Sequence, residues 1–174
     1  IDAIARTARE FGFSSTYDLP VSAVSRGLMP DKVWKKENYN QRWLLGDTLN
    51  AGIGQGYILT TPMQIAVMTA RIASGRKIIP RLINAKAGKI TPLKDPSTLE
   101  FNKLTLAKIR QGMDVAVNDI DGTAYKSRII EPKFRFAGKT GTAQVRRITE
   151  AERENGVTKN EDLPWKKRDH ALFV

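Results

Sequence analysis

Apolar residues recur at intervals of three or four in three stretches of the chain, residues 1–11, 62–74 and 104–118. This spacing places them on one side of an α-helix, so the pattern predicts three amphipathic helices that each bury one face. The apolar positions are Ile1, Ile4, Ala8 and Phe11 in the first stretch, Ile65, Met68 and Ile72 in the second, and Leu106, Ile109, Met113 and Val117 in the third.

The middle helix has sequence signals at both of its ends. Thr61 is a favoured N-cap, Pro62 suits the first helical position, and Gln64 completes the pattern of a capping box. Gly75 is placed to end the helix, because glycine adopts the left-handed conformation of a C-terminal cap without strain. We therefore expect a buried scaffold helix between Thr61 and Gly75.

Strands are expected elsewhere. Apolar pairs at residues 78–79 and 82–83 are typical of short edge strands, whereas residues 13–40 have an irregular pattern in which Asp31 is placed to start a short helix. Phe134, Phe136 and Val145 indicate a strand around them, and residues 169–174 form the next one. Residues 146–168 between these two strands are polar and charged, and loops of this length are often functional or mobile.

This order of elements indicates an α+β fold, in which an antiparallel sheet is flanked by helices. The chain has 174 residues, of which 41% are hydrophobic and 27% charged, enough for one domain with a core. It has no cysteine, which excludes disulfides and thiolate metal sites, and its single histidine, His170, excludes a multi-histidine metal site. We interpret His170 as a structural residue.

Basic residues outnumber acidic ones, with a net charge of +11. Such an excess suggests anionic partners: a nucleic acid, a membrane surface or an acidic polymer. A basic, solvated surface is the alternative. Many of the basic residues lie in the long loop, namely Arg146, Arg147, Lys159, Lys166, Lys167 and Arg168.

Both ends of the sequence lie inside apolar patterns, and the first residue is Ile rather than Met. We therefore expect an internal piece of a longer protein. No apolar run of 18 residues is present, so the sequence predicts no membrane span within this piece.

Three glycines, Gly52, Gly54 and Gly56, invite comparison with a phosphate-binding loop. A dinucleotide fingerprint would need a third glycine one position later, where Tyr57 stands, and a Walker loop would need a following Gly-Lys pair. We expect these glycines to let the backbone bend or approach another segment closely.

The chemistry is concentrated in Lys139-Thr140-Gly141-Thr142. A buried strand has no structural use for a cation, two hydroxyls and a glycine within four residues. At an exposed edge, the ammonium and the hydroxyls can bind an anion, and the backbone beside Gly141 is open to close approach by a ligand. Lys-Thr-Gly is also a signature of serine β-lactamases and penicillin-binding proteins.

The surrounding motifs make that signature specific. With Lys139–Val145, the chain resembles the C-terminal half of the transpeptidase domain of a class B penicillin-binding protein, in particular the elongation subgroup, so that residues 1–174 are one portion of a single domain. The other motifs that carry the resemblance are Gly46-Asp47-Thr48, Gly52-Ile53-Gly54-Gln55-Gly56-Tyr57, Thr61-Pro62-Met63-Gln64, Val117-Asn118-Asp119, Gly122-Thr123-Ala124 and Asp169-His170-Ala171.

The resemblance implies an enzyme that cross-links peptidoglycan stem peptides through a serine acyl-enzyme, without a cofactor. It implies that Lys139 organises the electrostatics of the site, and that Thr140 and Thr142 bind the carboxylate of substrate or β-lactam. The Thr142 backbone N–H would be one of two oxyanion donors. Gly141 would leave room for the ligand.

The nucleophile itself is expected outside this chain. The family pattern S-x-x-K occurs once, at Ser74–Lys77. A nucleophile needs the N-terminus of a helix, where the N–H groups favour negative charge, but Ser74 is expected at a C-terminal end. No S-x-N or S-x-D follows it. We therefore expect the serine, its lysine and the second motif to lie upstream of Ile1, and this chain alone to be inactive.

Further expectations follow from the resemblance. The implied partners are stem peptides on a lipid-linked precursor, β-lactam antibiotics, a glycan polymerase and elongation-complex proteins, and no nucleic acid. The implied location is the periplasmic side of the bacterial inner membrane. Two alternatives stay open: a serine β-lactamase or β-lactam sensor of the same fold, and a basic nucleic-acid-binding module, for which the sequence offers charge but no recognition helix.

Overall fold

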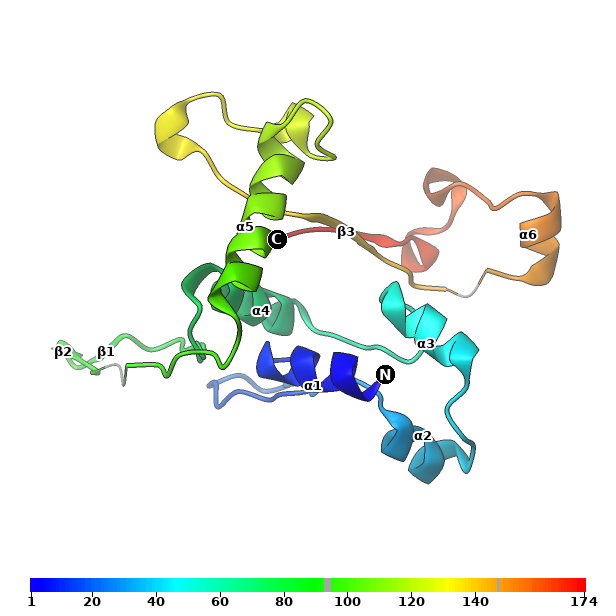
Figure 1. Cartoon of the computed structure of the whole chain (residues 1–174), viewed down its shortest axis with the longest axis horizontal. Helices are drawn as coiled ribbons and strands as arrows, with labels where there is room; N and C mark the ends of the chain where they lie inside the picture. Colours follow the sequence, from blue (N-terminus) through cyan, green and yellow to red (C-terminus); the bar gives the residue numbers. More distant parts are fainter. Residues whose placement is uncertain (93–94, 147) are drawn as a thin grey trace. The chain divides into compact units, whose positions relative to one another are not determined.

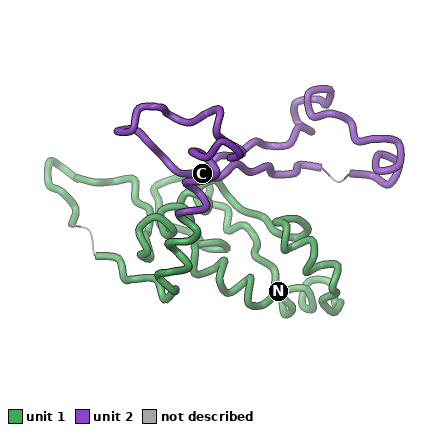
Figure 2. The backbone as a smooth tube through the Cα atoms, turned by 45° about the horizontal axis from the view of Figure 1, so that its top comes forward, with its two compact units in different colours: residues 1–110 green, residues 111–174 purple. Residues whose placement is uncertain are grey.

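A computed structural model of the protein describes residues 1–92, 95–146 and 148–174. The chain forms two compact units, residues 1–110 and residues 111–174 (Figure 2). Helices predominate, and the described strands form two antiparallel pairs, as expected for an α+β chain. Within the described ranges, no helix combines the length and the apolar character needed to cross a bilayer.

The first unit holds helices α1 to α4 and the start of α5, which Figure 1 labels. Its elements are α1 (Asp2–Glu10), α2 (Lys32–Tyr39), α3 (Leu45–Gly52), α4 (Pro62–Ser74), β1 (Ala85–Lys86), β2 (Lys89–Ile90) and the start of α5 (Lys103–Asn118). The second unit contains the end of α5, then η1 (Tyr125–Ser127), η2 (Pro132–Phe134), β3 (Thr140–Ala143), α6 (Glu150–Asn155), η3 (Asn160–Asp162), η4 (Trp165–Lys167) and β4 (His170–Phe173).

The three helices predicted from apolar spacing are confirmed as α1, α4 and α5. The ends of α4 form as predicted. The Thr61 hydroxyl accepts the Gln64 N–H at 3.2 Å, Pro62 is the first helical residue, and Gly75 ends the helix at a φ of 70°. Asp31 caps α2 by accepting the Trp34 N–H at 2.8 Å, which confirms the predicted helix start there.

The buried face of α4 differs from the predicted one. Its buried residues are Gln64, Val67 and Arg71, whereas Met68 and Ile72 are half-buried against the core and Ile65 is half-buried. Gln64 lies on the buried side because its polar side chain has hydrogen-bond partners there. The Gln64 amide donates to the carbonyls of Ser15 and Arg26 at 2.9 and 2.8 Å. These two carbonyls lie in an irregular segment, and the buried Gln64 amide supplies their hydrogen-bond donors.

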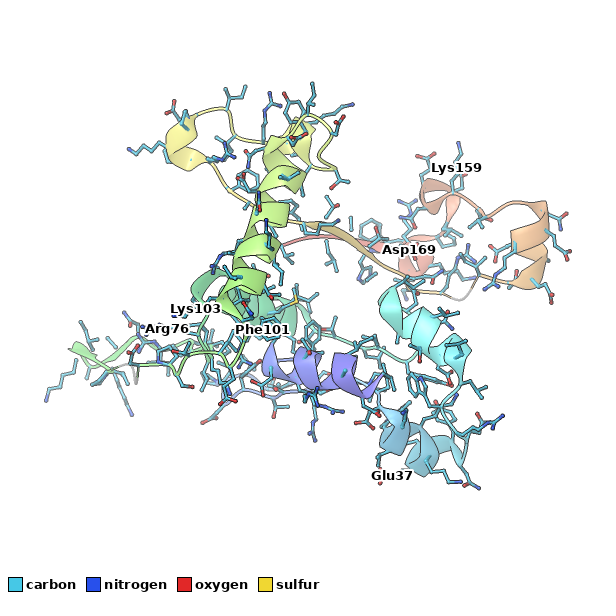
Figure 3. All side chains as sticks on the ribbon, in the orientation of Figure 1. Glu37, Arg76, Phe101, Lys103, Lys159 and Asp169 are labelled. Atoms are coloured by element: carbon cyan, nitrogen blue, oxygen red, sulfur yellow. The ribbon has the colours of Figure 1, made fainter. Side chains whose placement is uncertain are left out.

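The core of the first unit lies between α1, α4 and the start of α5. It comprises Phe11, Leu99 and Leu106, with Phe13, Met68, Ile72 and Phe101 packed around them. The rings of Phe11 and Phe101 meet edge to face, with centroids 5.2 Å apart. Figure 3 labels Phe101, which precedes α5.

The predicted edge strands at residues 78–79 and 82–83 are wrong. The short antiparallel hairpin forms later, with Ala85 opposite Ile90 and Lys86 opposite Lys89. Ile78 makes no strand because the guanidinium of Arg71, buried on α4, binds its carbonyl with both Nε and Nη2, at 3.2 and 3.1 Å. Apolar identity alone could not reveal that this carbonyl has a side-chain partner.

The glycine segment bends, as predicted, with φ values of 72° at Gly54 and 81° at Gly56. It follows helix α3, which the sequence pattern did not predict. Asp47 starts that helix by accepting the Leu44 N–H at 2.8 Å, and it forms an ion pair with Lys35, whose side chain is buried. The hydrogen bond from Lys35, with that from Leu44, holds the pKa of Asp47 below its usual value.

Candidate functional site

The Lys139–Thr142 segment lies on an antiparallel hairpin within the second unit. Thr140 is opposite Phe173, and Thr142 is opposite Ala171. The predicted strand is confirmed at its centre, but its flanks are wrong. Phe134 belongs to η2 and Val145 lies beyond the end of β3. The strand is short because pairing with β4 defines it, and Phe136 instead packs its ring against that of Phe173, 5.8 Å away.

The hydrogen-bond pattern decides which backbone groups of β3 are free. Lys139 and Val174 exchange both backbone hydrogen bonds, at 2.8 and 3.2 Å. In an antiparallel pair, hydrogen-bonded and non-hydrogen-bonded positions alternate. The N–H and C=O groups of Gly141 therefore point toward β4, whereas those of Thr140 and Thr142 point to the opposite edge. In the described part of the chain, β3 pairs with β4 alone, so this edge of β3 is open.

The Lys139 side chain folds along the strand. Its ammonium donates to the Thr140 carbonyl at 2.8 Å and to the Thr140 hydroxyl at 3.2 Å, and the side chain is exposed. The open edge thus combines a positive charge, two threonines and backbone N–H groups that have no partner among the described residues. Such a set of donors can bind a carboxylate and, at a backbone N–H, a developing oxyanion.

Thr123 adds a hydroxyl that the sequence analysis did not assign to the site. Its Oγ1 lies 3.2 Å from Oγ1 of Thr140. The turn that carries it packs tightly on α5, because a Cβ on Gly122 would lie 2.5 Å from the Ala116 carbonyl oxygen, and the Ala124 N–H donates to that same oxygen at 2.9 Å. The Gly-Thr-Ala motif was a usable signal, but its proximity to Thr140 depends on the folded structure.

Two glycines of this segment have different surroundings. A Cβ on Gly138 would lie 2.3 Å from Cζ of Phe173 and 2.5 Å from the Val174 carbonyl oxygen, so no larger residue fits. A Cβ on Gly141 would meet only Cβ of Leu172, at an ordinary 3.8 Å. Packing within the described chain therefore requires glycine at 138 but leaves room for a side chain at 141.

The segment between β3 and β4, expected as a loop, contains helix α6 (Figure 1). Thr149 caps α6 by accepting the Glu152 N–H at 3.3 Å, and Arg146 binds Glu152 with two nitrogens, at 2.8 and 2.7 Å. The Arg146 hydrogen bond, with help from Thr149, lowers the pKa of Glu152 to about 2. The capping-box pattern Thr-x-x-Glu was present in the sequence and could have predicted this helix.

The basic residues of this segment are not all free for partners. Arg146 is bound to Glu152, and Arg168 donates to the carbonyls of Leu163 and Glu161, both at 2.8 Å. Lys166 and Lys167 are exposed, and Arg147 lies outside the described residues.

Ser74 has the surroundings of a helix end rather than of a nucleophile. It is the last residue of α4, its hydroxyl donates to the Ala70 carbonyl at 2.7 Å, and Gly75 ends the helix directly after it. The Lys77 ammonium pairs with Glu10 at 3.2 Å. His170 is exposed on β4, opposite Ala143. No group of three metal-ligating side chains occurs among the residues that the structure places.

This fold and this strand define the class of protein. The family model described as the penicillin binding protein transpeptidase domain matches residues 1–165. The chain belongs to the penicillin-binding protein transpeptidase family, which confirms the resemblance seen in the sequence.

Within that family, the chain is similar to penicillin-binding protein 2 (PBP2). It is 32% identical over its whole length to the peptidoglycan D,D-transpeptidase MrdA of Haemophilus influenzae and to that of Acinetobacter baumannii. It spans 27% and 26% of these proteins, about a quarter of their length.

Solved structures agree with this placement. A crystal structure of Pseudomonas aeruginosa PBP2 in complex with WCK 5153 matches 100% of this chain and 35% of that one, with a TM-score of 0.77 and 33% identity. PBP2 in its complex with MreC from Helicobacter pylori matches 99% of this chain and 28% of that one, with a TM-score of 0.74 and 34% identity.

Proposed function

We propose that this chain is the C-terminal portion of the transpeptidase domain of a PBP2-type peptidoglycan D,D-transpeptidase. The observation that carries the proposal is the open edge of β3, where the Thr142 N–H has no partner among the described residues and the Lys139 ammonium donates to the Thr140 carbonyl. The nucleophilic serine, its lysine and the second motif belong to the upstream part of the full-length protein. The names of the curated relatives support this activity.

In the proposed reaction, the upstream serine attacks the carbonyl of the penultimate D-alanine of a stem peptide. The carbonyl oxygen becomes an oxyanion, and the Thr142 N–H stabilises it together with the N–H of the serine. The peptide bond then breaks, the proton of the serine hydroxyl passes through its lysine to the nitrogen of the leaving D-alanine, and an ester remains on the serine. An amine of a second stem peptide attacks this ester, which forms the cross-link and frees the serine.

The residues of this chain bind and orient the substrate. A stem peptide can lie along the open edge of β3 as an added strand, hydrogen-bonded to the backbone of Thr140 and Thr142. The hydroxyls of Thr140 and Thr142 bind its terminal carboxylate, and the Lys139 ammonium supplies a favourable potential. Gly141 leaves space for the bound ligand, consistent with the absence of any close neighbour that would itself require glycine there.

Partners and location follow from the same proposal. The solved relatives include PBP2 in complex with MreC and a peptidoglycan synthase complex that coordinates polymerisation and crosslinking. We infer a glycan polymerase and elongation proteins as partners here too, and a location at the periplasmic face of the inner membrane. The transpeptidase is favoured over a β-lactamase or sensor by the names of the relatives, and over a nucleic-acid-binding module by the family match.

The test is covalent labelling with a fluorescent penicillin. The full-length protein should label at a serine upstream of this chain, and mass spectrometry of the labelled peptide should locate that serine. This chain alone should take up no label. An ester on Ser74 would contradict the proposed position of the nucleophile, and an unlabelled full-length protein would contradict the function.

Thr123 offers a finer test of the site. Replacing Thr123 by Val removes the hydroxyl 3.2 Å from Thr140 but keeps the side-chain volume. We expect the acylation rate constant for penicillin to fall about fivefold, the equivalent of one lost neutral hydrogen bond of about 1 kcal/mol. Thr123→Ser keeps the hydroxyl and should react like wild type. Equal rates for Thr123→Val and wild type would exclude a role for this hydroxyl.

A further inference from the structure

The β3–β4 ladder ends in an unusual way at its loop side. Ala143 and His170 form the last strand pair. If the ladder continued with the same alternation, Val145 and Arg168 would form its next hydrogen-bonded pair. Instead, the Val145 N–H donates to Oδ1 of Asp169 at 3.0 Å. A side-chain carboxylate therefore takes the place of the next backbone carbonyl, at the start of β4 where Figure 3 labels Asp169.

The backbone of Asp169 is itself held by the loop. Its N–H donates to Oδ1 of Asn160 at 2.8 Å, and the Asn160 amide is 3.5 Å from its carbonyl. The guanidinium of Arg168 turns into the loop and binds the carbonyls of Leu163 and Glu161. Val145, Asn160 and Asp169, here called the Asp169 cluster, thus close the loop at its base and hold both strand ends.

The Asp169 cluster lies close to the proposed oxyanion donor along the strand. Thr142 is one residue before the last strand pair and three before Val145. Because Thr142 occupies a non-hydrogen-bonded position, its own N–H and C=O do not hold it to β4. Its position depends on the pairs on either side, and on the loop side these are Ala143–His170 and the bond to Asp169.

We propose that Asp169 is a positioning residue for acylation, which fixes the Thr142 N–H by ending the β3–β4 ladder with its carboxylate. This inference rests on the proposed function. Asp169 itself touches no substrate. What matters is its acceptor oxygen on the Val145 N–H, so an uncharged acceptor of the same shape can replace it.

The experiment compares Asp169→Ala and Asp169→Asn in the full-length protein. Stopped-flow acylation by penicillin separates the dissociation constant of the initial complex from the acylation rate constant. We expect Asp169→Ala to lower the rate constant about tenfold with little change in the dissociation constant, since small displacements of a reacting group cost much in rate. Asp169→Asn should stay within about twofold of wild type. Asp162→Ala, which removes an exposed carboxylate from the same loop, should also react like wild type.

Amide hydrogen exchange tests the structural step without any ligand. A peptide spanning residues 140–146 should exchange faster in Asp169→Ala than in wild type, and Asp169→Asn should restore protection. If wild type acylates but Asp169→Ala acylates equally fast, the positioning role is wrong while the proposed function stands. If Asp169→Asn is as slow as Asp169→Ala, charge rather than the acceptor matters, and the inference is likewise overturned. A wild type that does not acylate would instead contradict the proposed function.

Discussion

Lys139→Ala in the full-length protein should lower the second-order rate constant of penicillin acylation by about 10²-fold or more. The Lys139 ammonium is hydrogen-bonded to the carbonyl and hydroxyl of Thr140 on β3. Removing it takes away both the favourable potential for the ligand carboxylate and the restraint on that hydroxyl. Loss of one preorganised donor in such sites typically costs about 10²–10³ in rate.

The matched control for this substitution is Lys133→Ala. Lys133 is an exposed lysine in η2 of the same unit, and its ammonium lies 5.7 Å from the ring centroid of Phe134. Both variants lose one positive charge from a chain of net charge +11. If long-range attraction of anionic ligands were the cause, the rate constants of both variants would fall equally, and raising the salt concentration would bring both close to that of wild type. A Lys139→Ala protein that reacts within about threefold of wild type would remove Lys139 from the proposed site.

Gly138→Ala should destabilise the protein, whereas Gly141→Ala should leave its stability unchanged and slow its reaction. At position 138, the new methyl group would overlap the Phe173 ring and the Val174 carbonyl, so β3 and β4 must separate locally. We expect a loss of about 3 kcal/mol in folding stability, the upper end for overpacking, because one of the clashing atoms is backbone. At position 141, the methyl group has room within the chain and should leave the melting temperature unchanged.

The effect of Gly141→Ala is expected in reactivity rather than in stability. If a ligand lies along the open edge of β3, it must approach the backbone beside Gly141 closely. Gly141→Ala should then slow penicillin acylation about tenfold at unchanged stability. Thermal denaturation and acylation kinetics of the two variants, measured side by side, check both parts. A stable Gly141→Ala protein with wild-type kinetics would mean that the ligand does not approach this glycine.

Local sequence signals were enough to predict helices α1, α4 and α5 and both ends of α4, whereas α3 and α6 were missed. Thr61, Gln64 and Gly75 act within a few residues of one another, so α4 begins and ends where expected. The same capping signal at Thr149 and Glu152 marks α6. Features that depend on distant partners could not be predicted. The carbonyl of Ile78 is bound by Arg71, and the strand predicted there does not form.

In the candidate site too, local features could be predicted from the sequence and contacts between separate segments could not. Its residue types were readable, because a lysine, two threonines and a glycine in one strand have few structural uses. The open edge and the bond from Val145 to Asp169 could not be predicted because they depend on the register between β3 and β4, and the Thr123 hydroxyl could not because it depends on how the turn after α5 meets β3. Register is a pairwise property, and a single sequence does not state it.

The buried Gln64 imposes a constraint of another kind. Its amide donates to the carbonyls of Ser15 and Arg26, and its oxygen accepts from the Thr60 hydroxyl and the Thr61 N–H, each at 3.2 Å. A carboxylate at this position could only accept, and an ammonium could only donate. Position 64 is therefore chemically fixed although it takes no part in the proposed reaction. A survey of tolerated substitutions would rank it beside the residues of the β3 edge, for reasons that belong entirely to folding.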